Sequence, residues 1–253
     1  MSFFRPAPIK TMENDKYLPP TDRDDPKTED NLGCMYAQGR GVEQNDTEAV
    51  KWFRLAAVRG FAQAQFHLGG MYDLGRGVEQ NHAEAIKWYQ LAAEQGYAQA
   101  QHNLAVAYYE GQGVEQNYAE AVKWYRLAAE QGFTQAQISL AEIYSIGEGV
   151  EQNYSEAIKW YRLAAEQGSV EAQNNLAGRY YKGRGVEQSY TDAVKWYQRA
   201  AEQGFSIAQF NLGFLYAQGK GVEQNSAEAV KWYRRAAEQG HTEAKMALKG
   251  YEY

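Results

Sequence analysis

The tryptophans of this 253-residue chain recur at one fixed interval. All six are spaced by 36 residues, at Trp52, Trp88, Trp124, Trp160, Trp196 and Trp232. A period of this size is typical of a stacked array of short units rather than of a closed globule. Aligning the chain on its tryptophans predicts a repeat domain over 25–241, with units at about 26–61, 62–97, 98–133, 134–169, 170–205 and 206–241.

The second unit, AQAQFHLGGMYDLGRGVEQNHAEAIKWYQLAAEQGY, shows how each repeat is built. Apolar residues at helical spacing predict a first helix over about 62–74, and the following Gly-Arg-Gly predicts a tight turn. Asn81 and Glu84 have the spacing of a capping box, so a second helix starts there. Its buried stripe is expected to contain Trp88 and Tyr89 among alanines. One such pair cannot bury its own apolar faces, so the repeats must stack.

These units resemble Sel1-like repeats, as LGGMYDLGRGVEQNHAEAIKWYQLAAEQG and LGFLYAQGKGVEQNSAEAVKWYRRAAEQG illustrate. The resemblance covers about residues 28–248. It implies an all-α fold, a right-handed alpha-alpha superhelix like tetratricopeptide arrays, with about six helix-turn-helix repeats. The resemblance also implies that the protein functions as an adaptor or scaffold through protein–protein contacts. Thr28 and Asp30 depart from the pattern, which suggests that the first unit is a capping repeat.

The two ends differ from the repeats. Residues 1–24 form a proline-rich tail, for which two interpretations stay open: a disordered or surface-draped segment, or docking through Phe3, Phe4 and Tyr17. Residues 242–253 are predicted to form a C-terminal capping helix that covers the last apolar face.

Charge and hydropathy exclude some partners. A net charge of −6 offers no basic field for phosphates, so neither nucleic acid nor an anionic membrane is expected as a partner. No apolar stretch approaches the roughly 18 residues of a membrane-spanning helix, and the start has no secretory signal pattern. The chain as written is predicted to be cytoplasmic, or periplasmic or secreted if a signal has been removed.

No catalytic residue, metal ligand or cofactor site is predicted. None of the four histidines is expected to stand in a tight ligand cluster with cysteine or carboxylates, and HAEA at 82–85 lacks the second histidine of a zinc signature. Cys34 has no evident base beside it in sequence, so a buried or half-buried thiol is expected. Some secreted Sel1-like proteins are linked to penicillin binding or hydrolysis, but those are disulfide-rich and this chain has one cysteine.

Residues of the first helices that vary from repeat to repeat form the predicted binding surface. The predicted partner-binding residues are Phe66, Asp73, His102, Asn103, Tyr109, Ile138, Glu142, Asn174, Asn175, Tyr181, Phe210, Asn211 and Phe214. The resemblance to tetratricopeptide arrays implies that Asn103, Asn175 and Asn211 hold a peptide backbone, and local capping or water contact is the alternative. Lysines that clamp a C-terminal carboxylate in such arrays have no clear counterpart here.

The sequence therefore predicts a non-enzymatic scaffold or adaptor that binds a partner protein or extended peptide on the concave face formed by the first helices. A finer hypothesis, from the resemblance, is a regulator of a signalling partner or an immunity protein that neutralises a bacterial effector. The alternatives are a hydrolase or penicillin-binding activity, and a self-assembling structural protein.

Overall fold

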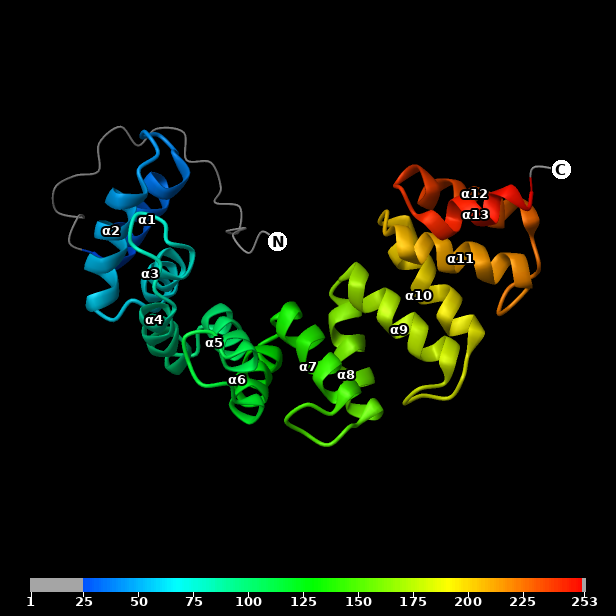
Figure 1. The fold of residues 1–253 in the computed structure, drawn as a ribbon, viewed down its shortest axis with the longest axis horizontal. Coiled ribbons are helices and arrows are strands. Elements are labelled where there is room, and N and C mark those ends of the chain that lie inside the picture. Colours follow the sequence, from blue (N-terminus) through cyan, green and yellow to red (C-terminus); the bar gives the residue numbers. More distant parts are fainter. Residues whose placement is uncertain (1–24, 252–253) are drawn as a thin grey trace. The chain divides into compact units, whose positions relative to one another are not determined.

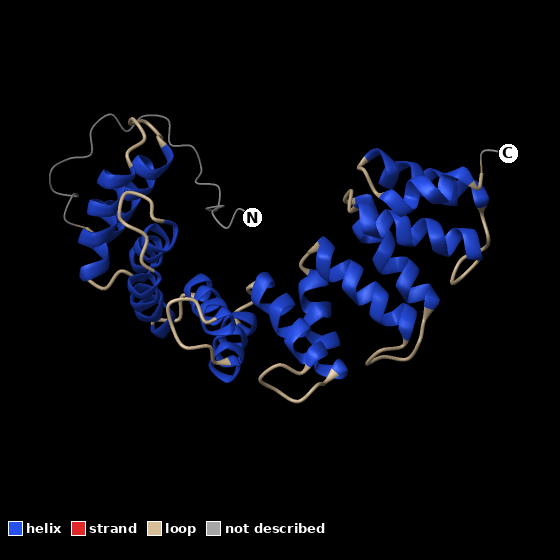
Figure 2. Cartoon of the chain, viewed as in Figure 1, coloured by secondary structure: helices blue, strands red, loops and turns tan. Residues whose placement is uncertain are grey.

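The computed structural model describes residues 25–251, which form thirteen α-helices and no strand (Figures 1 and 2). The helices are α1 Pro26–Gln38, α2 Asp46–Val58, α3 Ala62–Leu74, α4 His82–Glu94, α5 Ala98–Glu110, α6 Tyr118–Glu130, α7 Thr134–Ile146, α8 Tyr154–Glu166, α9 Val170–Lys182, α10 Tyr190–Glu202, α11 Ser206–Gln218, α12 Ser226–Glu238 and α13 Thr242–Lys249. None of these helices is long and apolar enough to span a bilayer. The predictions for the tail lie outside the described residues.

The chain divides into two compact units, residues 1–81 and 82–253. In the described part of the first unit, α1 packs on α2 and α2 packs on α3. In the second unit each helix likewise packs on the next, from α4 against α5 through to α12 against α13. This order of contacts confirms the predicted all-α solenoid, because each repeat buries its apolar face against its neighbours.

The helix ends follow from local chemistry. The first helix of the second repeat spans Ala62–Leu74, as predicted. In the third repeat the Asn117 side chain accepts a hydrogen bond from the Glu120 backbone N–H at 3.1 Å, which caps the start of α6. Gly111, with φ +70°, ends α5 in the left-handed conformation that glycine adopts without strain.

In every turn after the first, the second glycine also lets successive repeats approach closely. Gly149 has φ +71°, and a Cβ there would lie 2.8 Å from the Tyr118 carbonyl carbon at the start of α6. The residue before it, Glu148, accepts a hydrogen bond from Tyr109 of the preceding repeat. These contacts give the Gly-x-Gly turns a structural role in stacking.

The core corrects the prediction for tryptophan. Tyr125 and Tyr161 are buried at 4% and 2% exposure, whereas Trp124 and Trp160 are only half-buried and Trp232 alone is buried. The residue after each tryptophan, Phe53 in the first repeat and tyrosine in the other five, is rotated by about 100° around the helix and points at the first helix of its repeat. The tryptophan therefore lies at the edge of the core, where cations cover several of the rings, as Lys123 covers Trp124.

A ladder of buried glutamines connects the repeats and was not predicted. Gln137 Nε2 on α7 donates to the Ala129 carbonyl oxygen of the preceding repeat at 3.1 Å. Its Oε1 accepts from Gln167 Nε2, at the end of α8, at 2.8 Å. The same pair of bonds recurs at Gln101, Gln173 and Gln209. Each glutamine thus adds a side-chain hydrogen bond to a carbonyl at the end of the preceding helix, which also accepts from the backbone N–H three residues later.

Replacing Gln137 with Met should lower the free energy of unfolding by about 1–3 kcal/mol, because it removes two side-chain hydrogen bonds, one to the Ala129 carbonyl and one from the Gln167 amide. Gln135, two residues earlier and exposed, provides the matched control. Urea unfolding of Gln137→Met and Gln135→Met measures the difference. Equal stability of the two variants would contradict the structural role of the ladder.

Candidate functional site

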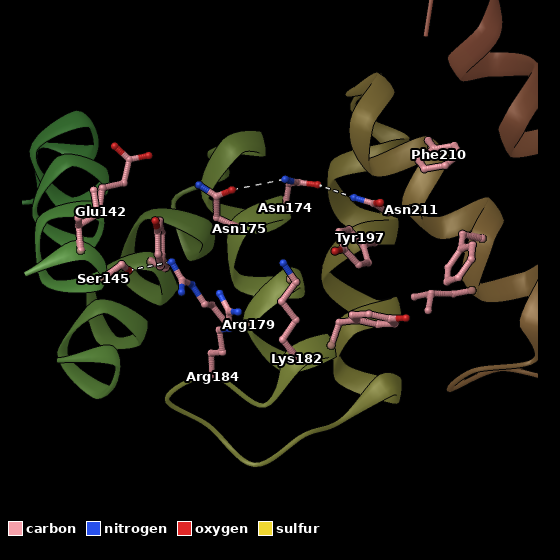
Figure 3. Close-up of a pocket in the computed structure, with 16 residues that line it drawn as sticks. Glu142, Ser145, Asn174, Asn175, Arg179, Lys182, Arg184, Tyr197, Phe210 and Asn211 are labelled. Carbon is pink, nitrogen blue, oxygen red and sulfur yellow. Dashed lines mark hydrogen bonds between the residues drawn. The ribbon is translucent and has the colours of Figure 1, made fainter. Parts of the chain in front are cut away.

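A groove of about 740 Å³ opens in the second unit between first helices of successive repeats (Figure 3). Its walls are α7, α9 and α11, and Tyr161 of α8 and Tyr197 of α10 contribute from the second helices. The spacing of 36 residues places equivalent first-helix positions side by side here, so residues that differ between repeats meet in one surface.

Amide side chains form one edge of the groove. Asn211 Nδ2 on α11 donates to Asn174 Oδ1 on α9 at 3.3 Å, and Asn174 Nδ2 lies 3.5 Å from Asn175 Oδ1 (Figure 3). Each amide both donates and accepts, so the row retains hydrogen-bonding capacity after these contacts are made. Such groups suit the N–H and C=O groups of an extended backbone.

Cations dominate the charge of the groove. Arg179, Lys182 and Arg184 line it, against a single carboxylate at Glu142. Arg179 is held in place, because its Nη2 donates to Ser145 Oγ at 2.8 Å. In contrast, the side chains of Lys182 and Arg184 are exposed and make no ion pair or hydrogen bond with any residue in 25–251.

The carboxylate of the groove has a perturbed pKa. Desolvation raises the pKa of Glu142, Glu171 raises it further, and Arg179 opposes the shift. The Ser145 hydroxyl donates to the Ala141 carbonyl oxygen at 2.7 Å and accepts from Arg179, so it is committed to structure. No histidine or cysteine is among the residues that line this groove.

Seven predicted partner-binding residues line the groove together. They are Glu142, Asn174, Asn175, Tyr181, Phe210, Asn211 and Phe214. Phe214 is the most open of the aromatic rings, at 36% exposure, and Lys220 lies over both Phe214 and Tyr181. Sequence reasoning missed the cations, since it followed variation at the aromatic and amide positions.

The other predicted residues lie elsewhere. His102 and Ile138 are buried at 6% and 4% exposure, so they are not available to a partner, and their prediction as contact residues is wrong. Neighbouring helices cover both side chains, whereas Asn174 and Phe210, at the same position of later repeats, line the groove. Asn103 lies beside His102, with Oδ1 3.4 Å from its Nδ1.

Tyr109, also predicted as a contact residue, is half-buried and outside the groove. Its hydroxyl donates to Glu148, and this hydrogen bond is the main reason that its pKa is raised to about 12. Phe66 and Asp73 belong to the first unit, where both are half-buried on α3.

Stability should fall in mild acid because of His102. Burial lowers the pKa of this histidine, and a hydrogen bond to Asn103 opposes the shift. A folded pKa below the unfolded value of about 6.5 gives stability that is present above that pH and lost as pH falls through the folded pKa. The neighbouring Tyr125 stays neutral throughout, since burial raises its pKa.

His102→Phe should remove this pH dependence, because phenylalanine occupies the equivalent position in two other repeats, at Phe66 and Phe210. Urea midpoints of the variant and the natural chain between pH 5 and 8 test the prediction. Parallel curves for the two proteins would contradict it.

A second cluster lies in the first unit. Asp30 and Cys34, one turn apart on α1, meet His67 of α3, and all three are buried. His67 Nδ1 lies 2.7 Å from Asp30 Oδ1 and 3.8 Å from Cys34 Sγ. Burial alone would lower the pKa of His67, but the hydrogen bonds to Asp30 and Cys34 outweigh it and raise the pKa to about 9.

This cluster corrects the expectation that no histidine stands with a cysteine and a carboxylate. The cysteine and the aspartate are separated from His67 by more than 30 residues, so local sequence spacing does not reveal them. Only an alignment of the repeats reveals this cluster. In that alignment, three polar side chains replace the residues found where other neighbouring repeats meet.

Stacked pairs of 13-residue helices with an open groove on their first-helix side define a helical-repeat scaffold. The Sel1 repeat family model matches residues 28–61, 62–97, 98–133, 134–169, 170–205 and 206–241. The chain therefore belongs to the Sel1 repeat family.

Solved structures agree with this assignment. A protective antigen from uropathogenic Escherichia coli, described as displaying an SLR fold, is 40% identical over 90% of this chain, with a TM-score of 0.88. The chain spans only 49% of that protein. A Sel1 repeat protein from Oxalobacter formigenes is 37% identical, with 87% of this chain and 88% of that chain covered and a TM-score of 0.75.

An immunity protein from Pseudomonas aeruginosa shares the fold at 19% identity, with a TM-score of 0.50 over 88% of this chain and 82% of that one. No match to this chain is found among curated proteins.

Proposed function

We propose that the chain is a non-enzymatic scaffold whose groove between α7, α9 and α11 binds an extended acidic segment of a partner protein. The observation that carries this proposal is the pair of cations Lys182 and Arg184, which face the groove without a carboxylate partner in the described chain. Cationic side chains that are already exposed lose little on meeting a carboxylate, and they form charge-assisted hydrogen bonds with it.

The second helices provide an internal comparison. Their lysines form ion pairs with acidic residues one turn earlier, as Lys159 does with Glu156 and Lys195 with Asp192. The chain as a whole carries a charge of −6, yet its fixed charges act over only about 8 Å at physiological salt. A ligand in the groove therefore experiences the local positive charge more than the distant negative charge.

The remaining walls favour an extended segment with aromatic or aliphatic side chains. Asn174, Asn175 and Asn211 offer amide groups along one edge, and Tyr181 and Phe214 offer rigid rings opposite. Backbone groups of an extended peptide match the amides, and apolar side chains between the acids match the rings. The likeness to an immunity protein shows the shared fold alone, so we define the partner by its chemistry.

Selection from a random peptide library displayed on phage tests this function. The natural chain should select peptides rich in Asp and Glu interspersed with aromatic residues. Lys182→Glu with Arg184→Glu should weaken the selected peptides by about 10–100-fold, the effect of losing roughly 1.5–3 kcal/mol of charge-assisted hydrogen bonding.

Lys159→Glu with Lys195→Glu is the matched control, since it makes the same charge change on the exposed second helices. This control should bind the selected peptides as the natural chain does. Selection of no peptide, selection without acidic bias, or equal weakening by both double variants would contradict the proposal. Light scattering could instead show that the natural chain is a dimer and that only the Lys182 and Arg184 double variant is a monomer. That result would mean that the groove binds a second copy of the chain.

A further inference from the structure

We infer that Asp30, Cys34 and His67 form a zinc-binding site that joins α1 to α3. They supply one carboxylate oxygen, one sulfur and one imidazole nitrogen, and these atoms all lie within 4.8 Å of one another. Zinc accepts this mixture of ligands, and three protein ligands with one water complete a tetrahedral shell. This site is separate from the groove and does not depend on the function proposed for it.

The observed separations are close to those that zinc requires. Tetrahedral bonds of about 2.3 Å to sulfur and about 2.0–2.2 Å to nitrogen and oxygen place sulfur about 3.6 Å from nitrogen, and nitrogen about 3.4 Å from oxygen. The corresponding distances here are 3.8 Å from Cys34 Sγ to His67 Nδ1 and 2.7 Å from His67 Nδ1 to Asp30 Oδ1. The three ligand atoms lie within 4.8 Å of one another, so zinc requires them to draw together by about 1 Å.

The composition of this seam differs from that of the equivalent seams. The positions that correspond to Asp30, Cys34 and His67 hold Phe66, Gly70 and Asn103 at the next seam. The later seams hold His102, Val106 and Ser139, then Ile138, Glu142 and Asn175, then Asn174, Gly178 and Asn211. None of these trios contains more than one zinc-ligand side chain, whereas the first contains three.

The ligands of this cluster are shielded from water. Asp30 is 1% exposed and His67 is 6% exposed, and the two form a buried pair at 2.7 Å. The Phe53 and Phe66 rings lie against His67, with centroids 4.9 and 5.7 Å from its own, and restrict its orientation. Such an apolar surround holds the ligands and limits exchange.

Zinc binding releases two protons. Zn²⁺ replaces the thiol proton of Cys34 and the proton between His67 Nδ1 and Asp30, and both protons pass to the buffer. Cys34, at 9% exposure, is the ligand nearest to solvent, so water enters on its side as the fourth ligand. The metal then cross-links the first helices of two successive repeats.

Cobalt substitution in the full, tag-free chain tests the site. Co²⁺ added to chelator-treated protein should produce a thiolate-to-cobalt charge-transfer band with one metal per chain, and Zn²⁺ should abolish the band. Cys34 is the only cysteine, so the band identifies it without ambiguity. Zinc should also raise the thermal midpoint of the chain.

Substitutions copied from the equivalent seams keep the variants foldable. Cys34→Val should remove the band, and Cys34→Val and His67→Asn should each weaken zinc binding by at least about 100-fold. His102→Asn, which changes a buried histidine outside the cluster, should bind zinc as the natural chain does. Absence of the band from the folded natural chain, or unchanged zinc affinity in Cys34→Val, would overturn the inference.

If a variant fails to fold, the zinc X-ray absorption spectrum of the natural chain tests the site without any variant. It should contain one sulfur scatterer at about 2.3 Å, and a zinc shell of nitrogen and oxygen only would overturn the site.

Discussion

Phe214→Ser should weaken the binding of acidic peptides by about 30-fold while leaving the free energy of unfolding within about 0.5 kcal/mol. The Phe214 ring lines the groove at 36% exposure, so its removal leaves little uncovered core. A rigid aromatic contact in a groove contributes about 2 kcal/mol to binding, which corresponds to that factor. Fluorescence anisotropy with a selected peptide and urea unfolding measure the two quantities.

Phe210 provides the comparison, because it lines the same groove but is also part of the fold. Its ring stacks on His241 at 4.9 Å and contacts Tyr233 at 5.6 Å, so Phe210→Ser should lose both stability and binding. If Phe214→Ser unfolds the chain as much as Phe210→Ser does, the groove aromatics are structural and the binding assignment is wrong.

Tyr125→Ala should cost about 3–5 kcal/mol of unfolding free energy, whereas Trp124→Ala should cost clearly less. Tyr125 is 4% exposed inside the core around α6, α7 and α8, and Trp124 lies half-buried at its margin. Truncating Tyr125 leaves a cavity that the surrounding alanines and leucines cannot fill, while solvent replaces part of the tryptophan ring.

Chemical unfolding of the two single variants measures this pair. A larger loss for Trp124→Ala than for Tyr125→Ala would contradict the burial order in the structure and restore the tryptophan as the main core residue of the repeat.

The fold was predictable because the local signals agreed from repeat to repeat, with Ser189 replacing the capping asparagine once. The period of 36, the Gly-x-Gly turns and the asparagine caps each predict the same boundaries, and α3 begins and ends where the periodicity placed it. The Trp–Tyr order was not predictable in this way, since adjacent residues on a helix differ by about 100° and either could face the partner helix. Packing against the first helix decides in favour of tyrosine.

The groove was predictable only in part. Variation between repeats located Tyr181, Phe214 and the asparagine row, but the same criterion selected His102 and Ile138, which the seam covers. Whether a first-helix position faces the groove or the seam depends on how closely neighbouring repeats approach, and a single repeat does not contain that information.

Long-range contacts could not be predicted from the sequence for the same reason. Gln137 and Gln167 meet across 30 positions, and Asp30 and His67 meet across 37. Nothing in the residues between them marks the pairing. Comparing whole seams, rather than single positions, would have found the unusual trio at Asp30, Cys34 and His67.

Amide hydrogen exchange of the natural chain, with and without the tightest acidic peptide from the selection, tests the groove most directly. Bound peptide should slow exchange in α9 and α11 and in the turn that carries Arg184, and leave the outer faces of α8 and α10 unchanged. Slowed exchange confined to the second helices, or to residues before α7, would contradict binding in this groove.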